Sequence, residues 1–265
     1  MSTKTLTFWE HLDELRASLI RIVIVTVIFG FIAFFFKDYL FSLVLAPKNE
    51  SFVTYTIFRD ISNFFLSSGN EGEAFSVQLI NTGLAEQFVI HMKVAMYAGL
   101  LCASPYILYL LFRFVAPALY SNEKRYAFRV VLGGYIMFLL GVLLNYFLIF
   151  PLTFRFLGTY QVSTEVVNMI SLHSYVDTLM MLSLMMGLVF EIPILCWLFA
   201  KFGFLSAPFM RKYRRHAIVI LLVISAVITP TTDIFTLLLV AMPMYLLYEI
   251  SILIVMRCNK IEEVL

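Results

Sequence analysis

Six segments of this chain are almost wholly apolar, and four of them are long enough to cross a lipid bilayer as helices. The segments lie at about residues 19–36, 88–112, 128–150, 175–200, 217–229 and 234–256. A bilayer core of about 30 Å needs about 20 helical residues. Only 14% of the residues are charged, against about a quarter in a soluble domain. The sequence therefore predicts an all-α integral membrane protein with six transmembrane helices, and residues 1–265 are expected to form a single membrane domain.

The fifth and sixth segments are expected to be shorter than the others. The fifth, between His216 and Pro230, covers only about 20 Å as a helix. Pro243 interrupts the sixth, which also carries Glu249. Two short neighbouring helices should thin the bilayer around them.

The distribution of Lys and Arg predicts the orientation of the chain. With both termini on the inner side, fourteen of the 19 Lys and Arg residues fall inside. Positive residues are enriched in cytoplasmic loops, and an even number of spans agrees with this placement. The first outer loop, about residues 41–86, is the long one, and its stretch "FVTYTIF" alternates loosely enough to form a short strand.

Several classes of function find no support in the residues. Cys102, Cys196 and Cys258 are far apart and form no Cys/His cluster, so neither a disulfide framework nor a metal site is expected. No nucleophile elbow, P-loop or zinc-protease motif is present. The net charge of +2 gives no indication of nucleic-acid binding. We therefore expect neither an enzyme nor a bound cofactor.

The stretch "HLDELR" places carboxylates just before the first apolar segment. Glu10 fits a capping box with Thr7 as N-cap, and Asp13 has Arg16 three residues later as a local partner. Glu14 has no such neighbour. It is either a solvated acid near a helix start, where negative charge is favourable, or part of a binding site.

A second carboxylate without a clear structural task lies at the same expected membrane face. Glu123 is the one acid in the first inner loop, residues 112–128, where a local ion pair with Lys124 or Arg125 is the alternative. Together with Glu14 it suggests an acidic receptor for a basic ligand. Arginine suits such a receptor because its planar guanidinium binds carboxylates through two hydrogen bonds.

Three further polar residues lie within or next to the apolar segments. Glu191 is near the middle of the fourth segment, where an ionisable group is costly and indicates a functional site; a hydrogen-bonded packing role beside Pro193 is the alternative. Asn145 is expected to bond across helices, and Asp233 to cap the sixth helix. If Glu191 were a proton or substrate site, the chain would be a proton-coupled secondary transporter, but no repeat or second midplane charge supports this.

Five motifs follow one another over nearly the whole chain: "HLDELR", "ASPYILYLLFRFVAPALYSNEKR", "YFLIFPLTFRFL", "FEIPIL" and "ITPTTDIFTLLLVAMPMYLLYE". In these motifs and their order the chain resembles the TatC family, the polytopic core of the twin-arginine protein translocase. The resemblance implies a glove-shaped, concave six-helix bundle in the bacterial cytoplasmic (inner) membrane, with both termini cytoplasmic. It also implies export of folded proteins by the proton-motive force, with single-span TatA and TatB proteins as partners in a homo-oligomeric complex.

The same resemblance assigns roles to individual residues. It places Glu14 and Glu123 at the positions that bind twin-arginine signal peptides, and Arg16 and Phe114 at further positions tied to that function. Glu191 corresponds to the polar intramembrane residue on the concave side. Pro47, which enters the first outer loop, and Asp233, in the last outer turn, correspond to functional positions on the periplasmic side.

Overall fold

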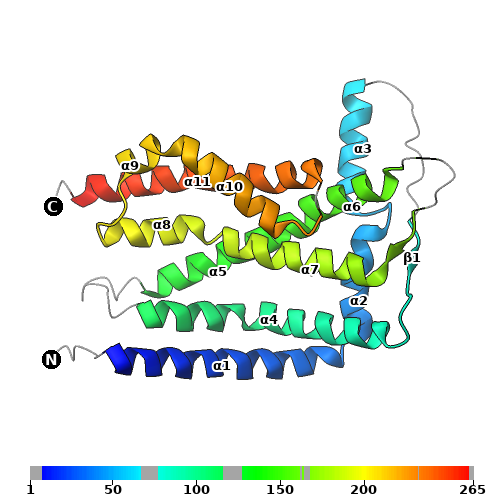
Figure 1. Cartoon of the computed structure of the whole chain (residues 1–265), viewed down its shortest axis with the longest axis horizontal. Coiled ribbons are helices and arrows are strands. Elements are labelled where there is room, and N and C mark those ends of the chain that lie inside the picture. The colour runs from blue at the N-terminus through cyan, green and yellow to red at the C-terminus, as the bar shows by residue number, and fades with distance from the viewer. Residues whose placement is uncertain are drawn as a thin grey trace. The chain divides into compact units, whose positions relative to one another are not determined.

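The computed structural model describes residues 8–66, 77–115, 127–161, 163, 168–231 and 233–262 (Figure 1). The chain divides into two compact units. One comprises residues 1–40 and 91–136, and the other comprises residues 41–90 and 137–265. Most described residues are helical, as the sequence predicts.

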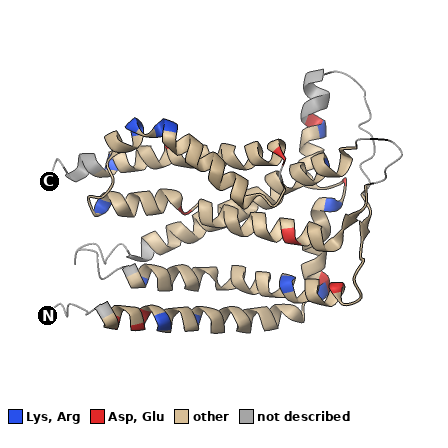
Figure 2. Cartoon of the chain, viewed as in Figure 1, with Lys and Arg blue, Asp and Glu red and all other residues tan. Residues whose placement is uncertain are grey.

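Five helical stretches within the described ranges are long and apolar enough to cross a membrane: Trp9–Phe34, Glu86–Phe114, Val130–Thr159, Leu172–Lys201 and Ile234–Cys258. Charged side chains lie mainly toward the ends of the long helices and are sparse along their middles (Figure 2). This distribution is expected of helices whose middle turns face lipid, because a charge at the bilayer centre is costly.

The first unit is built from α1 (Phe8–Phe34), most of α4 (Glu86–Val115) and the first turns of α5 (Ala127–Leu144). Close backbone contact holds α1 against α4. A side-chain Cβ at Gly99 would lie 2.4 Å from the backbone nitrogen of Gly30, so only glycine fits there. Near the other end of α1, the imidazole of His91 stacks on Phe34 with ring centroids 4.0 Å apart. Small residues that let backbones approach are the usual packing device between membrane helices.

The second unit contains the remaining helices. They are the second half of α2 (Lys37–Leu45), the 3-10 turn η1 (Ala46–Lys48), α3 (Val53–Leu66), the π-turn η4 (Asn145–Ile149), α6 (Phe150–Thr159), α7 (Leu172–Val189), α8 (Ile192–Lys201), α9 (Ala207–Lys212), α10 (Arg214–Ile228) and α11 (Ile234–Glu262). Two short parallel strands, β1 (Leu79–Ile80) and β2 (Ile170–Ser171), join the loops, with Leu79 opposite Ile170.

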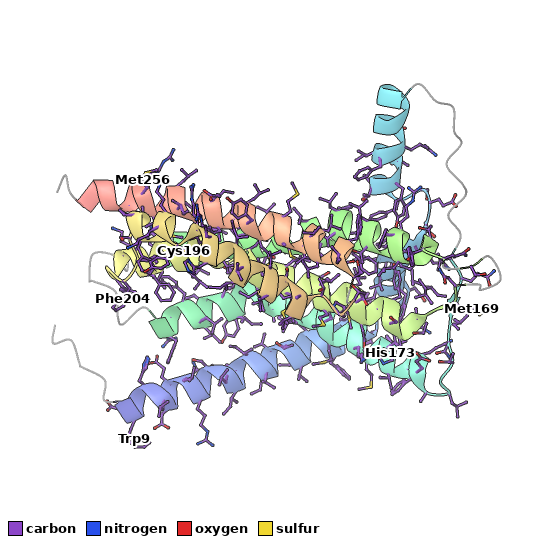
Figure 3. The ribbon with its side chains drawn as sticks, turned by 45° about the horizontal axis from the view of Figure 1, so that its top comes forward. Trp9, Met169, His173, Cys196, Phe204 and Met256 are labelled. Carbon is purple, nitrogen blue, oxygen red and sulfur yellow. The ribbon has the colours of Figure 1, made fainter. Side chains whose placement is uncertain are left out.

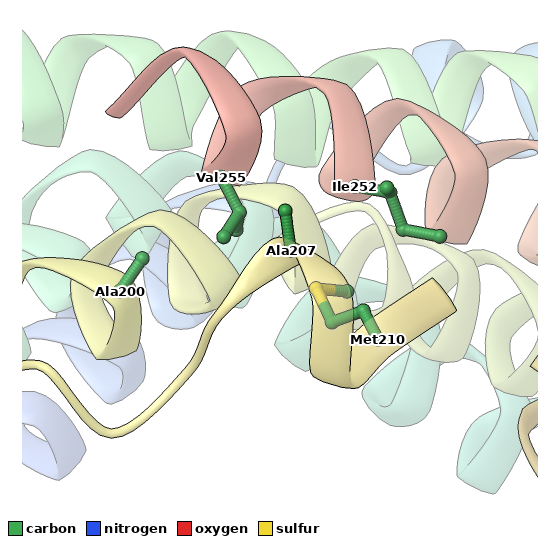
Figure 4. Close-up of a cluster of buried hydrophobic side chains, with 5 residues drawn as sticks. All are labelled: Ala200, Ala207, Met210, Ile252 and Val255. Carbon is green, nitrogen blue, oxygen red and sulfur yellow. The ribbon is translucent and has the colours of Figure 1, made fainter. Parts of the chain in front are cut away.

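The second unit's core forms where η4, α6, α7 and α11 meet. Ile149, Phe150, Val176, Leu182, Met186 and Met244 are fully buried there. A separate cluster fixes α9 between α8 and α11: Ala200, Ala207, Met210, Ile252 and Val255 (Figure 4).

The outer loop differs from the prediction in its secondary structure. The stretch "FVTYTIF" lies in the helix α3, apart from Phe52 directly before it, and not in a strand, and α3 runs across the direction of α7 (Figure 1). Its apolar residues recur at helical spacing: Phe52 and Tyr55 are buried, and Phe52 packs its ring on Phe147 of η4. A buried face with period 3.6 therefore prevails over the loose alternation.

Two predicted span boundaries also need correction. The third helical stretch continues past Phe150 to Thr159, because Pro151 sits in the first turn of α6, directly after the π-turn, where a missing N–H costs little. The sixth helix is not short. The 29-residue α11 runs through Pro243 without a break, and Glu249 within it is paired. The fifth helix is short as predicted, with 15 residues in α10.

Candidate functional site

The acidic stretch "HLDELR" forms the second and third turns of α1. Glu14 is partly buried, and within the described part of the chain its carboxylate makes no hydrogen bond or ion pair. Asp13 and Arg16 are both exposed, and the ion pair expected between them is not formed. The proposed N-cap Thr7 lies outside the described residues. Glu14 is thus a carboxylate at a helix start with no intramolecular charge partner among those residues.

An aromatic contact brings the end of α4 to this part of α1. The imidazole of His11 stacks on the ring of Phe114, with centroids 4.1 Å apart and planes inclined by 13°. His11 and Glu14 are three residues apart on one helix and therefore share a face. The structure consequently brings Glu14 and Phe114 into one neighbourhood. Glu123, the other predicted carboxylate, lies outside the described residues.

His11 was not predicted to belong to this neighbourhood. Its contact with Phe114 joins residues about a hundred positions apart in the sequence, and no local pattern indicates such a pair. The one indication in the sequence was that Phe114 is an aromatic residue near the end of an apolar segment. Such residues are common in membrane proteins, so this feature alone could not identify His11 as its partner.

Glu191 occupies the short break between α7 and α8. Its backbone carbonyl accepts hydrogen bonds from Ile194 and Leu195 at the start of α8, and Pro193 follows in the first turn. One carboxyl oxygen, Oε1, is buried and has no hydrogen-bond partner among the described residues. The backbone of Glu191 and the following Pro193 therefore account for the break between α7 and α8. No contact with the described residues assigns a structural role to the Oε1 atom of Glu191.

Pro47 is buried in η1, where it serves as an anchor for α3. The hydroxyl of Tyr55 lies 3.0 Å from the carbonyl oxygens of both Pro47 and Pro151, so its proton is shared between η1 and α6. Burial raises the pKa of Tyr55 and keeps it a hydrogen-bond donor at any physiological pH. Pro47 therefore helps to fix how the outer segment packs on the second unit.

Asp233 caps α11, as predicted. Its Oδ2 accepts a hydrogen bond from the backbone N–H of Thr236 at 2.7 Å. Burial opposes ionisation of Asp233, but the hydrogen bonds it accepts outweigh burial and lower its pKa. A charged carboxylate at this position also interacts favourably with the helix dipole.

Asn145 joins two helices, also as predicted. Its side-chain amide donates to the hydroxyl of Ser183 at 2.7 Å, and both residues are buried. A pair that sequence reasoning missed is Arg214 with Glu249, 2.6 Å apart, where the hydroxyl of Tyr245 donates to the same carboxylate at 3.0 Å. Within the described residues, no group of three or more His, Cys, Asp or Glu side chains is arranged to hold a metal ion.

Comparison with known proteins places these features in a family. The sequence model of the Sec-independent protein translocase protein (TatC) family matches residues 10–243. A TatC protein from a Blattabacterium species is 34% identical over 256 residues, which cover 96% of each chain. A TatC protein from Aquifex aeolicus is 35% identical over 244 residues, or 92% of each chain. The fold also matches a crystal structure described as the twin-arginine translocase receptor TatC, with a TM-score of 0.74, 34% identity, and coverage of 94% of this chain and 100% of that one.

Proposed function

Because this chain belongs to the TatC family of Sec-independent protein translocase proteins, we propose that it is the signal-peptide receptor and core subunit of a twin-arginine translocase. Family membership makes it an all-α, multi-pass membrane protein of bacteria and a component of that translocase. The proposal adds the ligand, the residues that bind it and the energy source.

The observation that carries the proposal is the carboxylate of Glu14, which has no partner among the described residues and lies on the same face of α1 as the His11–Phe114 stack. A guanidinium group binds a carboxylate through two hydrogen bonds and also stacks on aromatic rings. This neighbourhood offers both kinds of contact. One arginine of the signal peptide would bind Glu14, and the other would bind Glu123. The ring of Phe114 would pack against the arginine that binds Glu14. Arg16 lies on the exposed side of α1, the helix that carries Glu14.

The orientation of the chain follows from the same proposal. Arginines of a signal peptide arrive from the cytoplasm, so the start of α1 lies on the cytoplasmic side, in agreement with the excess of Lys and Arg predicted there. Folded cargo would then cross with small single-span TatA and TatB proteins as partners in an oligomeric complex, driven by the proton-motive force. Glu191, whose Oε1 lacks a partner among the described residues, is the proposed intramembrane polar site, and Pro47 and Asp233 serve on the periplasmic side.

Peptide binding to the detergent-purified protein tests the proposal. A twin-arginine signal peptide should bind, and a twin-lysine peptide should bind more weakly by about 1–3 kcal/mol, because lysine cannot form the paired hydrogen bonds. Glu14→Gln and Glu123→Gln should each weaken binding of the arginine peptide. Asp13→Asn is the matched control, since Asp13 is an exposed acid adjacent to Glu14.

Equal binding of both peptides to every variant would refute the receptor proposal. The transporter alternative centred on Glu191 is not favoured, because membership of a translocase family accounts for the chain as a whole. It would regain interest only if the arginine peptide failed to bind and Glu191→Gln abolished a proton flux in vesicles.

A further inference from the structure

The corner where α8, α9 and α10 meet is strongly basic. Between Ile192 and Thr231 the chain carries five Lys and Arg residues and no Asp or Glu. Arg211, Lys212, Arg214 and Arg215 are all exposed. The acid that reaches this corner among the described side chains is Glu249, which is paired with Arg214. Lys201 has a partner of its own, but the charges of Lys212 and Arg215 are not balanced by an ion pair within the described residues.

The position of these cations is fixed by packing. Ala207 and Met210, on one face of α9, are buried against α8 and α11 (Figure 4), while Phe209, Arg211 and Lys212 are exposed. Arg214 is held by Glu249, whose second oxygen accepts the hydroxyl proton of Tyr245.

Exposed aromatic rings lie in the same stretch of chain as the cations. Phe204, labelled in Figure 3, lies in the connection between α8 and α9. It is 80% exposed, and Phe209 is 54% exposed. The rings of Phe209 and Tyr213 are 4.6 Å apart, and the ammonium group of Lys212 lies 5.9 Å from the Tyr213 ring centre. Aromatic rings next to Lys and Arg are typical of the membrane interface. An acidic protein segment would not require exposed phenylalanines at the same place.

An apolar groove begins one helical turn beyond the cations. A cavity of about 190 Å³ between α10 and α11 is lined by Ile218, Leu221, Leu222, Leu238, Ala241, Met242 and Tyr245. Ile218 follows Arg214 by four residues and Arg215 by three, so it shares their helix face. Tyr245 lines the groove and also joins the Arg214–Glu249 pair. The cationic corner and the groove are therefore continuous.

We propose that this corner and groove bind one anionic phospholipid. Its headgroup phosphate would lie between Lys212 and Arg215, with one acyl chain along the groove between α10 and α11. Lys212 and Arg215 form no ion pair with any described residue, so their charges are available. The site lies outside the residues proposed to bind the signal peptide, and it does not depend on that proposal.

Lipid titration of the purified full chain, followed by native mass spectrometry, tests the site. Phosphatidylglycerol should bind more tightly than phosphatidylcholine with the same acyl chains. The double change Lys212→Gln with Arg215→Gln should weaken phosphatidylglycerol binding by about thirtyfold, because each cation near an anionic lipid contributes a factor of about five. Lys37→Gln with Arg21→Gln removes the same charge from two other exposed positions and should leave the affinity unchanged.

A second pair of variants tests the groove. Ala241→Leu fills it and should weaken binding of phosphatidylglycerol but not of glycerol 3-phosphate, which has a phosphate and no acyl chain. Ala226→Leu makes the same change at an exposed position of α10 that does not line the groove and should have no effect. The proposal fails if the two lipids bind equally, if the double variant binds like its charge-matched control, or if an oligoglutamate peptide displaces the lipid at lower concentration than phosphatidylglycerol itself.

Discussion

Replacing Gly99 by alanine should push α1 away from α4, and the distances in the structure give the size of the displacement. An added Cβ would lie 2.4 Å from the nitrogen of Gly30, 2.6 Å from its Cα and 2.7 Å from the carbonyl oxygen of Thr26. All three atoms belong to the backbone of α1, so no side-chain rotation relieves the overlap. Carbon atoms pack at about 3.5–4.0 Å, and α1 must therefore retreat by about 1 Å.

The expected cost follows from overpacking in a close helix contact. Inserting a methyl group into a packed interior costs about 1–3 kcal/mol, which outweighs the gain of up to about 1 kcal/mol in helix propensity from glycine to alanine. Gly30→Ala should cost less, because its nearest contact at 2.8 Å is the flexible thioether of Met96. Gly133→Ala is the matched control: a Cβ there has no atom within 4 Å, so only the propensity gain remains.

Unfolding of the purified chain in mixed micelles, followed by circular dichroism, measures these differences. The order of stability should be Gly133→Ala, then Gly30→Ala, then Gly99→Ala. Since α1 carries Glu14, Gly99→Ala should also weaken the binding of a twin-arginine peptide although it alters no charge. If Gly99→Ala were as stable as Gly133→Ala, the close contact between α1 and α4 would be wrong.

Three further changes test contacts in the second unit. Asp233→Ala should cost about 1 kcal/mol of unfolding free energy, because it removes the cap of α11. The pKa of Asp233 is lowered in the folded state, so the stabilisation is present at neutral pH and is lost as the pH falls through that pKa, below the unfolded value of about 3.9. A cost that does not change with pH would contradict this prediction. Tyr175→Phe should cost about 1–3 kcal/mol, because the buried hydroxyl donates to the Val44 carbonyl at 2.9 Å and its loss leaves that oxygen unpaired; urea unfolding measures it, and an unchanged midpoint would argue against the contact. Asn145→Leu and Ser183→Ala should show a coupling of about 0.6 kcal/mol in a double-mutant cycle, and strict additivity would mean that the amide and hydroxyl do not interact.

The features predicted correctly are those that depend on residues close in the sequence. Apolar runs located the long helices because helix length is tied to bilayer thickness. Asp233 was identified as a cap because the group it binds is three residues away. Asn145 was predicted to bond across helices because an amide in an apolar segment has few other ways to pair, although its partner could not be named.

The features that were missed depend on contacts between distant residues. Tyr55 reaches Pro151, and Tyr175 reaches Val44, and neither pair follows a local pattern. The strand predicted for "FVTYTIF" failed because burial of Phe52 and Tyr55 against η4 and α6 selects a helix there. The ion pair predicted between Asp13 and Arg16 is an error of the opposite kind, because a local pattern predicted a contact that does not form. Suitable spacing alone does not hold two exposed side chains together.

A short helix beside a long one changes the expected effect on the bilayer. The 15 residues of α10 cover about 22 Å, less than a bilayer core of about 30 Å, while α11 has 29 residues and can cross fully. Thinning predicted for two adjacent short helices should therefore be confined to the exposed side of α10, where Val219, Val223 and Val227 face outward. The cations at the start of α10 would then draw lipid phosphates toward that side and deepen the local depression. Lipid-exposure probes placed along α10 and along α11 distinguish a bilayer that is thinned beside α10 from one that is not. If α10 were exposed to lipid over the full thickness of the bilayer core, the bilayer would not be thinned there.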